Sequence, residues 1–251
     1  MKKPKGKLTI PGVILFFIGI LLGMALNGWA DWGEVEAYML VFRSGDQDIA
    51  SIRCPLMLGP SETGVVSASF DNPTAESISP TVYAVIGRIG QTRTVTNVLT
   101  LTPGEKSQLS WKVGPDDKVF GGLILTNIFE TSQRNFSTHQ GSCGIPVSFF
   151  PGLTGMHTFI FIAAASLLGI LGGAALWLLG NFPLHGTIES ATNAGAALAA
   201  FVLAGMVSIL PDWWGLGLVC FFVAIMLIVV IVTQFMMFQP PSPTLPGKGK
   251  S

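Results

Sequence analysis

The sequence predicts a membrane protein that combines transmembrane α-helices with one all-β domain. Hydrophobic residues make up 49% of the 251 residues and charged residues 11%, far below the roughly 25% of ordinary soluble domains. Four apolar stretches are long enough to cross a bilayer, and short β-branched runs fill the segment between the first two. We therefore expect one N-terminal transmembrane helix, an exported antiparallel β-sandwich and then three transmembrane helices.

The apolar stretches divide the chain into spans and connections. A helix needs roughly 20 mostly apolar residues to cross about 30 Å of hydrocarbon while satisfying its own backbone hydrogen bonds. The expected segments are a basic cytoplasmic tail 1–7, a transmembrane helix 8–30, the β-sandwich 31–152, a second helix 153–180, a cytoplasmic loop 181–189, a third helix 190–210, an outer turn with the fourth helix 211–238, and a flexible cytoplasmic tail 239–251.

Lysines at both ends of the chain predict the orientation. Cytoplasmic segments next to transmembrane helices are enriched in Lys and Arg. Two cytoplasmic ends agree with an even number of spans, and they place residues 31–152 outside a plasma membrane that the chain crosses several times. The lysines concerned are Lys2, Lys3, Lys5, Lys7, Lys248 and Lys250.

The first span has a second interpretation, as a cleaved signal peptide. A basic segment precedes it, and Gly28 and Ala30 are small residues at suitable cleavage positions. Its apolar run exceeds the roughly 7 to 15 residues usual in signal peptides, which favours an uncleaved anchor. Residues 31–152 are exported in either case.

The exported segment has the pattern of an Ig-like β-sandwich. Runs such as "GVVSASF", "TVYAVIG" and "GGLILTNIF" alternate with turn sequences such as "DNPT" and "TPGE". In "SQLSWKV", Leu109, Trp111 and Val113 would point into the core while Ser110 and Lys112 face water.

Two cysteines in this segment predict a disulfide. Cys54 lies near its first strand and Cys143 in its last, and thiols in an exported domain are readily oxidised. Such a bridge stabilises the fold by roughly 4 to 5 kcal/mol in the chain-entropy model. The pair has no C-x-x-C spacing, so we interpret it as structural and not redox-active. The third cysteine, Cys220, lies within the fourth span and is expected to be inert.

Residues 59–113 resemble the CARDB-like and fibronectin type III-like domains of exported bacterial proteins. The turns that carry the resemblance are Pro60-Ser61-Glu62-Thr63-Gly64, Asn72-Pro73 and Pro103-Gly104-Glu105. The resemblance implies a sandwich fold and a role in adhesion, spacing or assembly, without specifying a ligand.

Four tryptophans lie near the expected outer membrane boundary. An indole there can bury its ring while its N–H stays hydrated. We interpret Trp29, Trp32, Trp213 and Trp214 as interfacial anchors.

Small residues recur at fourfold spacing in the second and third spans, where they let helix backbones approach closely. Because the connecting loop is short, we expect these spans to form an antiparallel hairpin, with dimerisation through one face as the alternative. The positions are Gly169 and Gly173, and Ala191, Gly195 and Ala199.

The sequence shows no catalytic, cofactor or metal motif. His139 and His157 fall outside and His185 inside, so the three cannot converge, and no pair has the spacing of a zinc site. Asp46 and Asp48 indicate a solvated turn, and we interpret Asn135-Phe136-Ser137 as a chance glycosylation match. The predicted spans hold no ionisable residue that would mark a transport path.

These observations favour a non-enzymatic integral membrane protein that presents its exported domain for protein interaction, adhesion or envelope assembly. The alternative is an accessory subunit of a membrane transporter or enzyme complex, docked through its small-residue helices. The expected partners are the lipid bilayer and a membrane or surface protein, with homo-oligomerisation left open. No basic surface pattern indicates nucleic acid, because Lys and Arg number 14 against 14 Asp and Glu.

Overall fold

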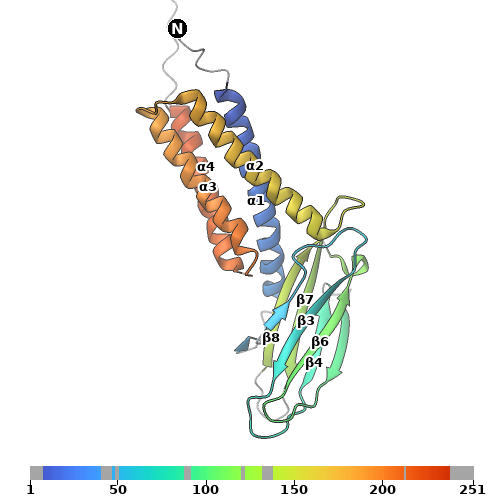
Figure 1. Ribbon diagram of the computed structural model, residues 1–251. Helices are drawn as coiled ribbons and strands as arrows, with labels where there is room; N and C mark the ends of the chain where they lie inside the picture. Colours follow the sequence, from blue (N-terminus) through green and yellow to red (C-terminus); the bar gives the residue numbers. More distant parts are fainter. Residues whose placement is uncertain are drawn as a thin grey trace, which may run out of the picture.

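A bundle of helices and a β-sandwich lie end to end in the computed structural model of the protein (Figure 1). The structure describes residues 8–40, 47–48, 51–87, 92–119, 122–131, 138–211 and 213–237. Both expected tails, Asp46, Asp212 and the Asn135-Phe136-Ser137 sequence lie outside these ranges. The described residues contain four helices that are long and apolar enough to cross a membrane, judged by length and composition.

The four helices are α1 (Thr9–Leu40), α2 (Gly155–Asn181), α3 (Thr187–Ser208) and α4 (Trp214–Met237). The first helix continues ten residues beyond the expected boundary at residue 30. Asp31, Glu34 and Glu36 end the apolar run, but hydropathy marks where a membrane ends and does not stop a helix. Gly33 and Ala37, spaced one turn apart, are buried against the sandwich and hold this continuation in place.

Two sheets form the sandwich. The first contains β1 (Gln47–Asp48), β8 (Thr138–Pro146), β7 (Leu123–Thr131), β4 (Thr81–Ile86) and β5 (Arg93–Val98), in that order. The second contains β2 (Ser51–Arg53), β3 (Gly64–Asp71) and β6 (Lys106–Val113), and a short 3₁₀ turn, Pro115–Asp117, follows β6. All pairs are antiparallel except β1 with β8.

One hydrophobic core fills the space between the sheets. Val66, Ala68 and Phe70 of β3 alternate into it, and Ile124 and Ile128 of β7 meet them from the other sheet. The inward direction expected for Leu109, Trp111 and Val113 is confirmed, because Trp111 and Val113 are buried in this core and the half-buried Leu109 packs against it. The Trp111 indole N–H donates to the Asn97 side-chain oxygen at 3.2 Å, which links β6 to β5 at the edges of the two sheets.

Glycines bring α2 into backbone contact with α1. A Cβ on Gly169 would lie 2.8 Å from the Gly19 Cα, and one on Gly173 would overlap the backbone of Phe16. The Ser166 hydroxyl donates to the Gly19 carbonyl at 2.8 Å, which satisfies the buried side chain inside this contact.

The expected hairpin of α2 and α3 is therefore wrong, since α2 packs along α1 while α3 packs on α4 and α1. The small residues of α3 do not meet those of α2. Gly195 approaches the Phe16 ring of α1, Ala199 joins the core of the bundle, and Ala191 is half-buried. A short loop fixes which helices are consecutive, but the glycine faces on α1 decide which helices touch.

Glu130 lies near the end of β7, in register with His139 on the neighbouring strand β8. Its burial raises the pKa of its carboxyl above the usual value of 4.5, while His139 acts to lower the pKa and Asp71 to raise it. Glu105 behaves oppositely, because hydrogen bonds from the Thr102 backbone N–H and hydroxyl lower its pKa.

Replacing Gly169 with Ala should destabilise the protein by about 1–3 kcal/mol, because the added methyl group meets backbone that cannot move aside. Gly172→Ala is the matched control. Its methyl would meet only the flexible Leu15 side chain at 3.3 Å, and Ala is intrinsically the better helix former. Thermal unfolding of the two variants in lipid nanodiscs checks this, and equal midpoints would contradict the packing described.

The pKa shift of Glu130 predicts how Glu130→Gln responds to pH. The folded state holds the proton more tightly than the unfolded state, so this carboxyl costs stability once pH rises above 4.5 and increasingly up to its folded pKa. Glu130→Gln should therefore melt higher than wild type at neutral pH and equally near pH 4. Glu105→Gln should melt no higher than wild type at neutral pH, and a gain there would refute the assignment.

Candidate functional site

The continuation of α1 beyond residue 30 packs against the outer face of β7 and β8. Gly33 on the helix and Gly144 on β8 touch through their backbones, and a Cβ on Gly144 would overlap the Gly33 carbonyl. The Gly144 N–H donates to the Glu34 carboxylate at 3.1 Å. Among the described residues β1 pairs with β8 only at residues 139–140, and the Gly144 N–H has Glu34 as its acceptor.

Strand β7 is buried on both faces because it lies between the core and α1. Its outward-facing Leu123 and Leu125 form a second apolar cluster with Ala37 of the helix. The sequence carried a signal of this in the three consecutive apolar residues of "GGLILTNIF", Leu123 to Leu125, since strands with one wet face alternate and strands covered on both faces do not. The run indicates a covering element without indicating which one.

A second contact, made by hydrogen bonds to Glu62, joins the sandwich to the start of α2. The Glu62 carboxylate accepts hydrogen bonds from the Gly59 N–H at 2.8 Å and from the Gly155 N–H at 2.6 Å. Gly155 is the first residue of α2, where the helix dipole favours a negative charge. The Thr154 hydroxyl accepts from the His157 N–H in the same turn, so His157 contributes to the N-terminal cap of the helix.

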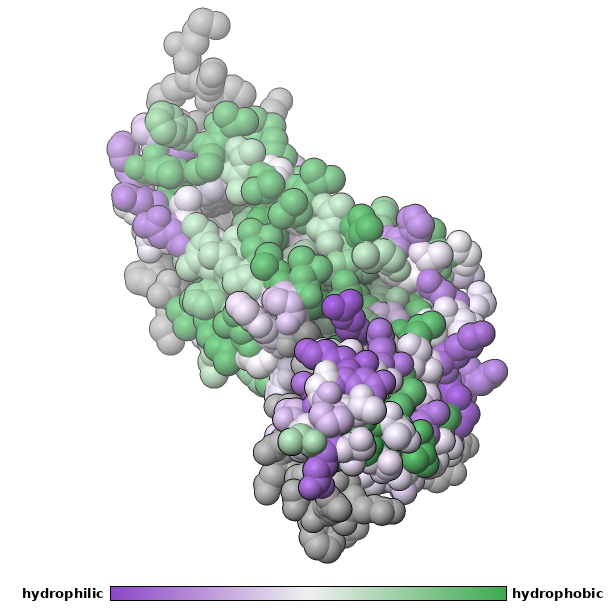
Figure 2. Space-filling view, turned by 60° about the horizontal axis from the view of Figure 1, so that its bottom comes forward, coloured by the Kyte–Doolittle hydropathy of each residue, from purple (hydrophilic) through white to green (hydrophobic). Residues whose placement is uncertain are grey.

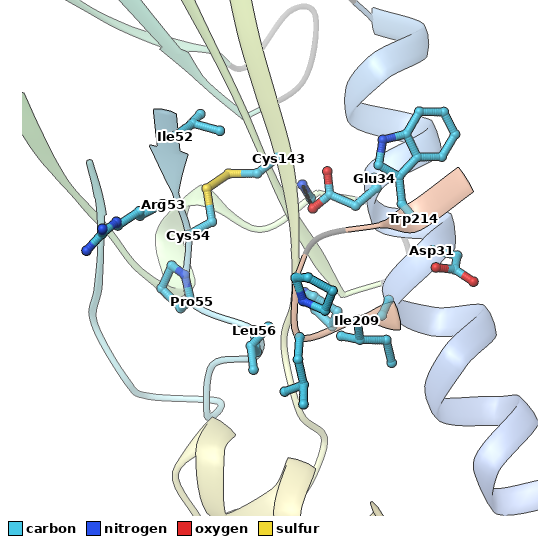
Figure 3. A pocket seen from close by; sticks show the side chains of 15 residues that line it. Asp31, Glu34, Ile52, Arg53, Cys54, Pro55, Leu56, Cys143, Ile209 and Trp214 are labelled. Atoms are coloured by element: carbon cyan, nitrogen blue, oxygen red, sulfur yellow. Dashed lines mark hydrogen bonds between the residues drawn. A yellow bond between two sulfur atoms is a disulfide. The ribbon is translucent and has the colours of Figure 1, made fainter. Parts of the chain in front are cut away.

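A cavity of about 410 Å³ lies where α1, the sandwich and the turn between α3 and α4 meet (Figure 3). Asp31 and Glu34 line it from α1, Ile209 and Trp214 line it from the turn and α4, and the Cys54–Cys143 disulfide lines it from the sandwich. In Figure 3 the Glu34 carboxylate points toward the strand that carries Cys143, whereas the Arg53 side chain extends away from the disulfide.

The predicted disulfide between Cys54 and Cys143 is present and closes a separation of 89 residues. Cys54 directly follows β2 and Cys143 lies in β8, so the bond links the three-stranded sheet to the five-stranded sheet. Cys143 points into the core while its neighbour Gly144 faces α1. The covalent link therefore holds the strand on which the helix rests.

The four tryptophans take different positions. Trp29 stacks on Phe149 with ring centroids 5.1 Å apart and 7° between the planes. The ring centroids of Trp214 and Tyr38 lie 5.6 Å apart. Trp32 and Trp213 are about 60% exposed. Trp29 and Trp214 thus pack within the junction, while interfacial anchoring stays a prediction for all four.

Buried polar residues lie on α1 beside the cavity, which Asp31 lines, and the sequence analysis did not identify them. Asn27 and Asp31 are each only 2% exposed, as is Ser208 at the end of α3. Asp31 falls just after the expected end of the first span, so it was assigned to the exported segment. Only the continuation of α1 places its carboxylate against α3 and α4. Within the described residues, no three His, Cys, Asp or Glu side chains form a metal-binding group.

No protein-family model and no curated protein matches the chain. A similar solved structure is a CARDB domain of Pyrococcus furiosus in complex with di-metal ions, at 16% identity and a TM-score of 0.32, over 39% of this chain and 84% of that one. The β-glucuronidase 2 of Bacteroides uniformis matches at 14% identity and a TM-score of 0.29, over 40% of this chain and 13% of that one. A β-glucosidase of Listeria innocua matches at 14% identity and a TM-score of 0.30, over 40% of this chain and 15% of that one. The chain thus spans about an eighth of the length of the β-glucuronidases that it matches. Similarity at this level carries no argument about activity or ligand.

Gly144→Ala should loosen the sandwich from α1 without unfolding it, because the added methyl group overlaps the helix backbone and not the core. Spin labels at Glu36 on the helix and at Val98 on β5 should give a narrow distance distribution in otherwise wild-type protein and a broad one in the variant. Gly114→Ala is the control, since nothing lies within 3.8 Å of its added Cβ. An intact Cys54–Cys143 bond on a non-reducing gel shows that the sandwich still folds, and an unchanged narrow distribution would contradict the prediction.

Proposed function

We propose that the protein is a non-enzymatic, multi-pass plasma-membrane protein that holds an extracytoplasmic Ig-like domain in a fixed orientation for protein interaction or envelope assembly. The observation that carries this proposal is the unbroken course of α1 from the bundle to Leu40, with Gly33 in backbone contact with Gly144. Together with the hydrogen bond from the Gly155 N–H to Glu62 at the start of α2, the contact between Gly33 and Gly144 fixes the domain at two points.

Charge, hydropathy and the disulfide support the membrane orientation. Apolar side chains gather over the helices and hydrophilic ones over the sandwich (Figure 2). A disulfide is typical of an oxidising compartment outside the cytoplasm. The lysines at both ends of the chain favour cytoplasmic termini, which places the sandwich on the opposite side of the bilayer.

A fixed orientation distinguishes this arrangement from a simple anchor. One helix and a flexible linker would suffice to keep a domain near the membrane, and the domain would then move freely. Here helix α1 itself enters the domain interface, so the sandwich keeps one height and one angle relative to the bundle. Such an arrangement suits a partner that is recognised at the membrane surface.

The alternative is an accessory subunit that docks a transporter or enzyme complex through its helices. Its supporting observation is the sparse contact between α2 and α3, which leaves much of α2 uncovered. The side chains of Leu168 and Leu179 on α2 are 70% and 74% exposed, and either lipid or a partner helix would cover them.

Photo-crosslinking in native membranes tests both functions with the same protein. A photoreactive residue at exposed Val98 on the sandwich should form adducts with an exported or envelope protein, and these adducts should decline in Gly144→Ala. The matched probe at Leu168 on α2 should react mainly with lipid. Adducts with another membrane protein at Leu168 alone would favour the accessory subunit, and protein adducts at neither position would contradict both functions.

A further inference from the structure

A buried cluster of oxygen atoms lies between α1, α3 and α4, beside the junction cavity. Its side chains are Asn27 and Asp31 on α1 and Ser208 at the end of α3, and we refer to these three as the Asp31 cluster. Asn27 and Asp31 are one helical turn apart and share a face of α1. All three side chains are 98% buried.

Contacts at Gly217 on α4 show that the Asp31 and Ser208 oxygens lie close together. A Cβ built on Gly217 would lie 2.5 and 2.8 Å from the two Asp31 carboxylate oxygens and 2.8 Å from the Ser208 hydroxyl. The Asn27 amide group packs against Gly205 of α3 in the same way, with its nitrogen 2.7 Å and its oxygen 3.2 Å from a Cβ built there. Glycine at both positions leaves space for the polar groups.

The hydrogen-bond donors of the cluster are already committed to backbone carbonyls. The Asn27 side-chain nitrogen donates to the Gly217 carbonyl at 3.1 Å, and the Ser208 hydroxyl donates to the Gly205 carbonyl at 2.7 Å. The Asn27 side-chain oxygen and Asp31 Oδ2 are buried and accept no hydrogen bond from the described residues. What remains are two buried acceptors without donors on one face of α1, one of them a carboxylate oxygen.

Asp31 forms no ion pair with any of the described residues, and Arg53, which lines the same cavity, extends away from the disulfide (Figure 3). The groups around it are the Cys220 thiol from α4, Ser208 from α3 and, one turn along its own helix, Glu34. A buried carboxylate without a partner is costly, and several acceptors without donors add to that cost. A single cation would satisfy the carboxylate, the amide oxygen and the hydroxyl together, whereas a proton on Asp31 would satisfy one acceptor.

We propose that the Asp31 cluster binds a hard monovalent cation, with Na⁺ as the ion that fits its chemistry. Hard cations take oxygen ligands, and one carboxylate balances one positive charge where divalent sites usually gather several. The C-terminal ends of helices take part in Na⁺ sites of transporters, and Ser208 lies at the C-terminal end of α3. Asp31 also lines the 410 Å³ junction cavity, which gives the ion a route from the side of the sandwich.

The bound ion joins three helices at the level where the bundle meets the sandwich. It holds this part of α1 against the end of α3 and the start of α4, and it makes the stability of this contact depend on the ions outside. This site does not require the interaction function proposed above, so crosslinking and ion binding succeed or fail separately.

Binding of radioactive sodium to the purified full-length protein in lipid nanodiscs tests the site, with choline keeping the ionic strength constant. Wild type should bind saturably and lose the label to excess unlabelled Na⁺. Asp31→Asn, which keeps the shape and removes the charge, should abolish saturable binding, and Ser208→Ala should weaken it. Glu36→Gln, which removes a carboxylate elsewhere on α1, should bind as wild type does.

Thermal unfolding of the same samples shows that the variants fold and supplies a second readout. Na⁺ should raise the melting temperature of wild type and Glu36→Gln through preferential binding to the folded state, and should leave Asp31→Asn unchanged. Melting that responds to pH but not to Na⁺ in wild type would assign the cluster to a proton and overturn the proposal. Saturable binding that survives in Asp31→Asn, or that Ca²⁺ alone displaces, would overturn it as well.

Discussion

The backbone contact between Gly33 and Gly144 determines how the two halves of the molecule are joined. It brings the backbone of α1 into contact with strand β8, an approach that any side chain at residue 144 would prevent. The contact places Leu123 and Leu125 beneath Ala37 and gives the Gly144 N–H its carboxylate acceptor. It also requires α1 to remain helical past Ala30, which in turn carries Asp31 into the bundle.

Helix α1 is the common element of the structure because it contacts every other helix and two strands. Close approach recurs along it, at Gly12 and Gly19 against α2 and at Gly33 against β8. Each of these contacts replaces side-chain packing with backbone packing, so they depend on shape and not on hydrophobicity alone. The bundle and the sandwich therefore share one rigid axis, and a change in α1 reaches both.

Local pattern was enough to predict the parts of the molecule but not how they meet. Alternation placed Trp111 in the core, and cysteine position indicated the bond between Cys54 and Cys143. The partner of Gly169 and Gly173 was misassigned because fourfold spacing reveals a flat helix face without naming what covers it. Asp31 was missed for a related reason, since a hydropathy window ends a span at the first charges, whereas tertiary contact with β8 keeps this helix going.

The polar residues of α1 lie where they affect both halves of the protein. Asn27 and Asp31 are buried polar residues of α1, and burying them weakens the bundle unless another group satisfies their oxygens. Two buried acceptors in one helical turn are costly for a helix that only needs to cross a bilayer. Asn27 lies six residues and Asp31 two residues before Gly33, and Asp31 lines a cavity that the disulfide also lines. A group bound at this position therefore affects both the packing of α1 on α3 and α4 and the contact of α1 with the sandwich, because the same turns of α1 make both contacts.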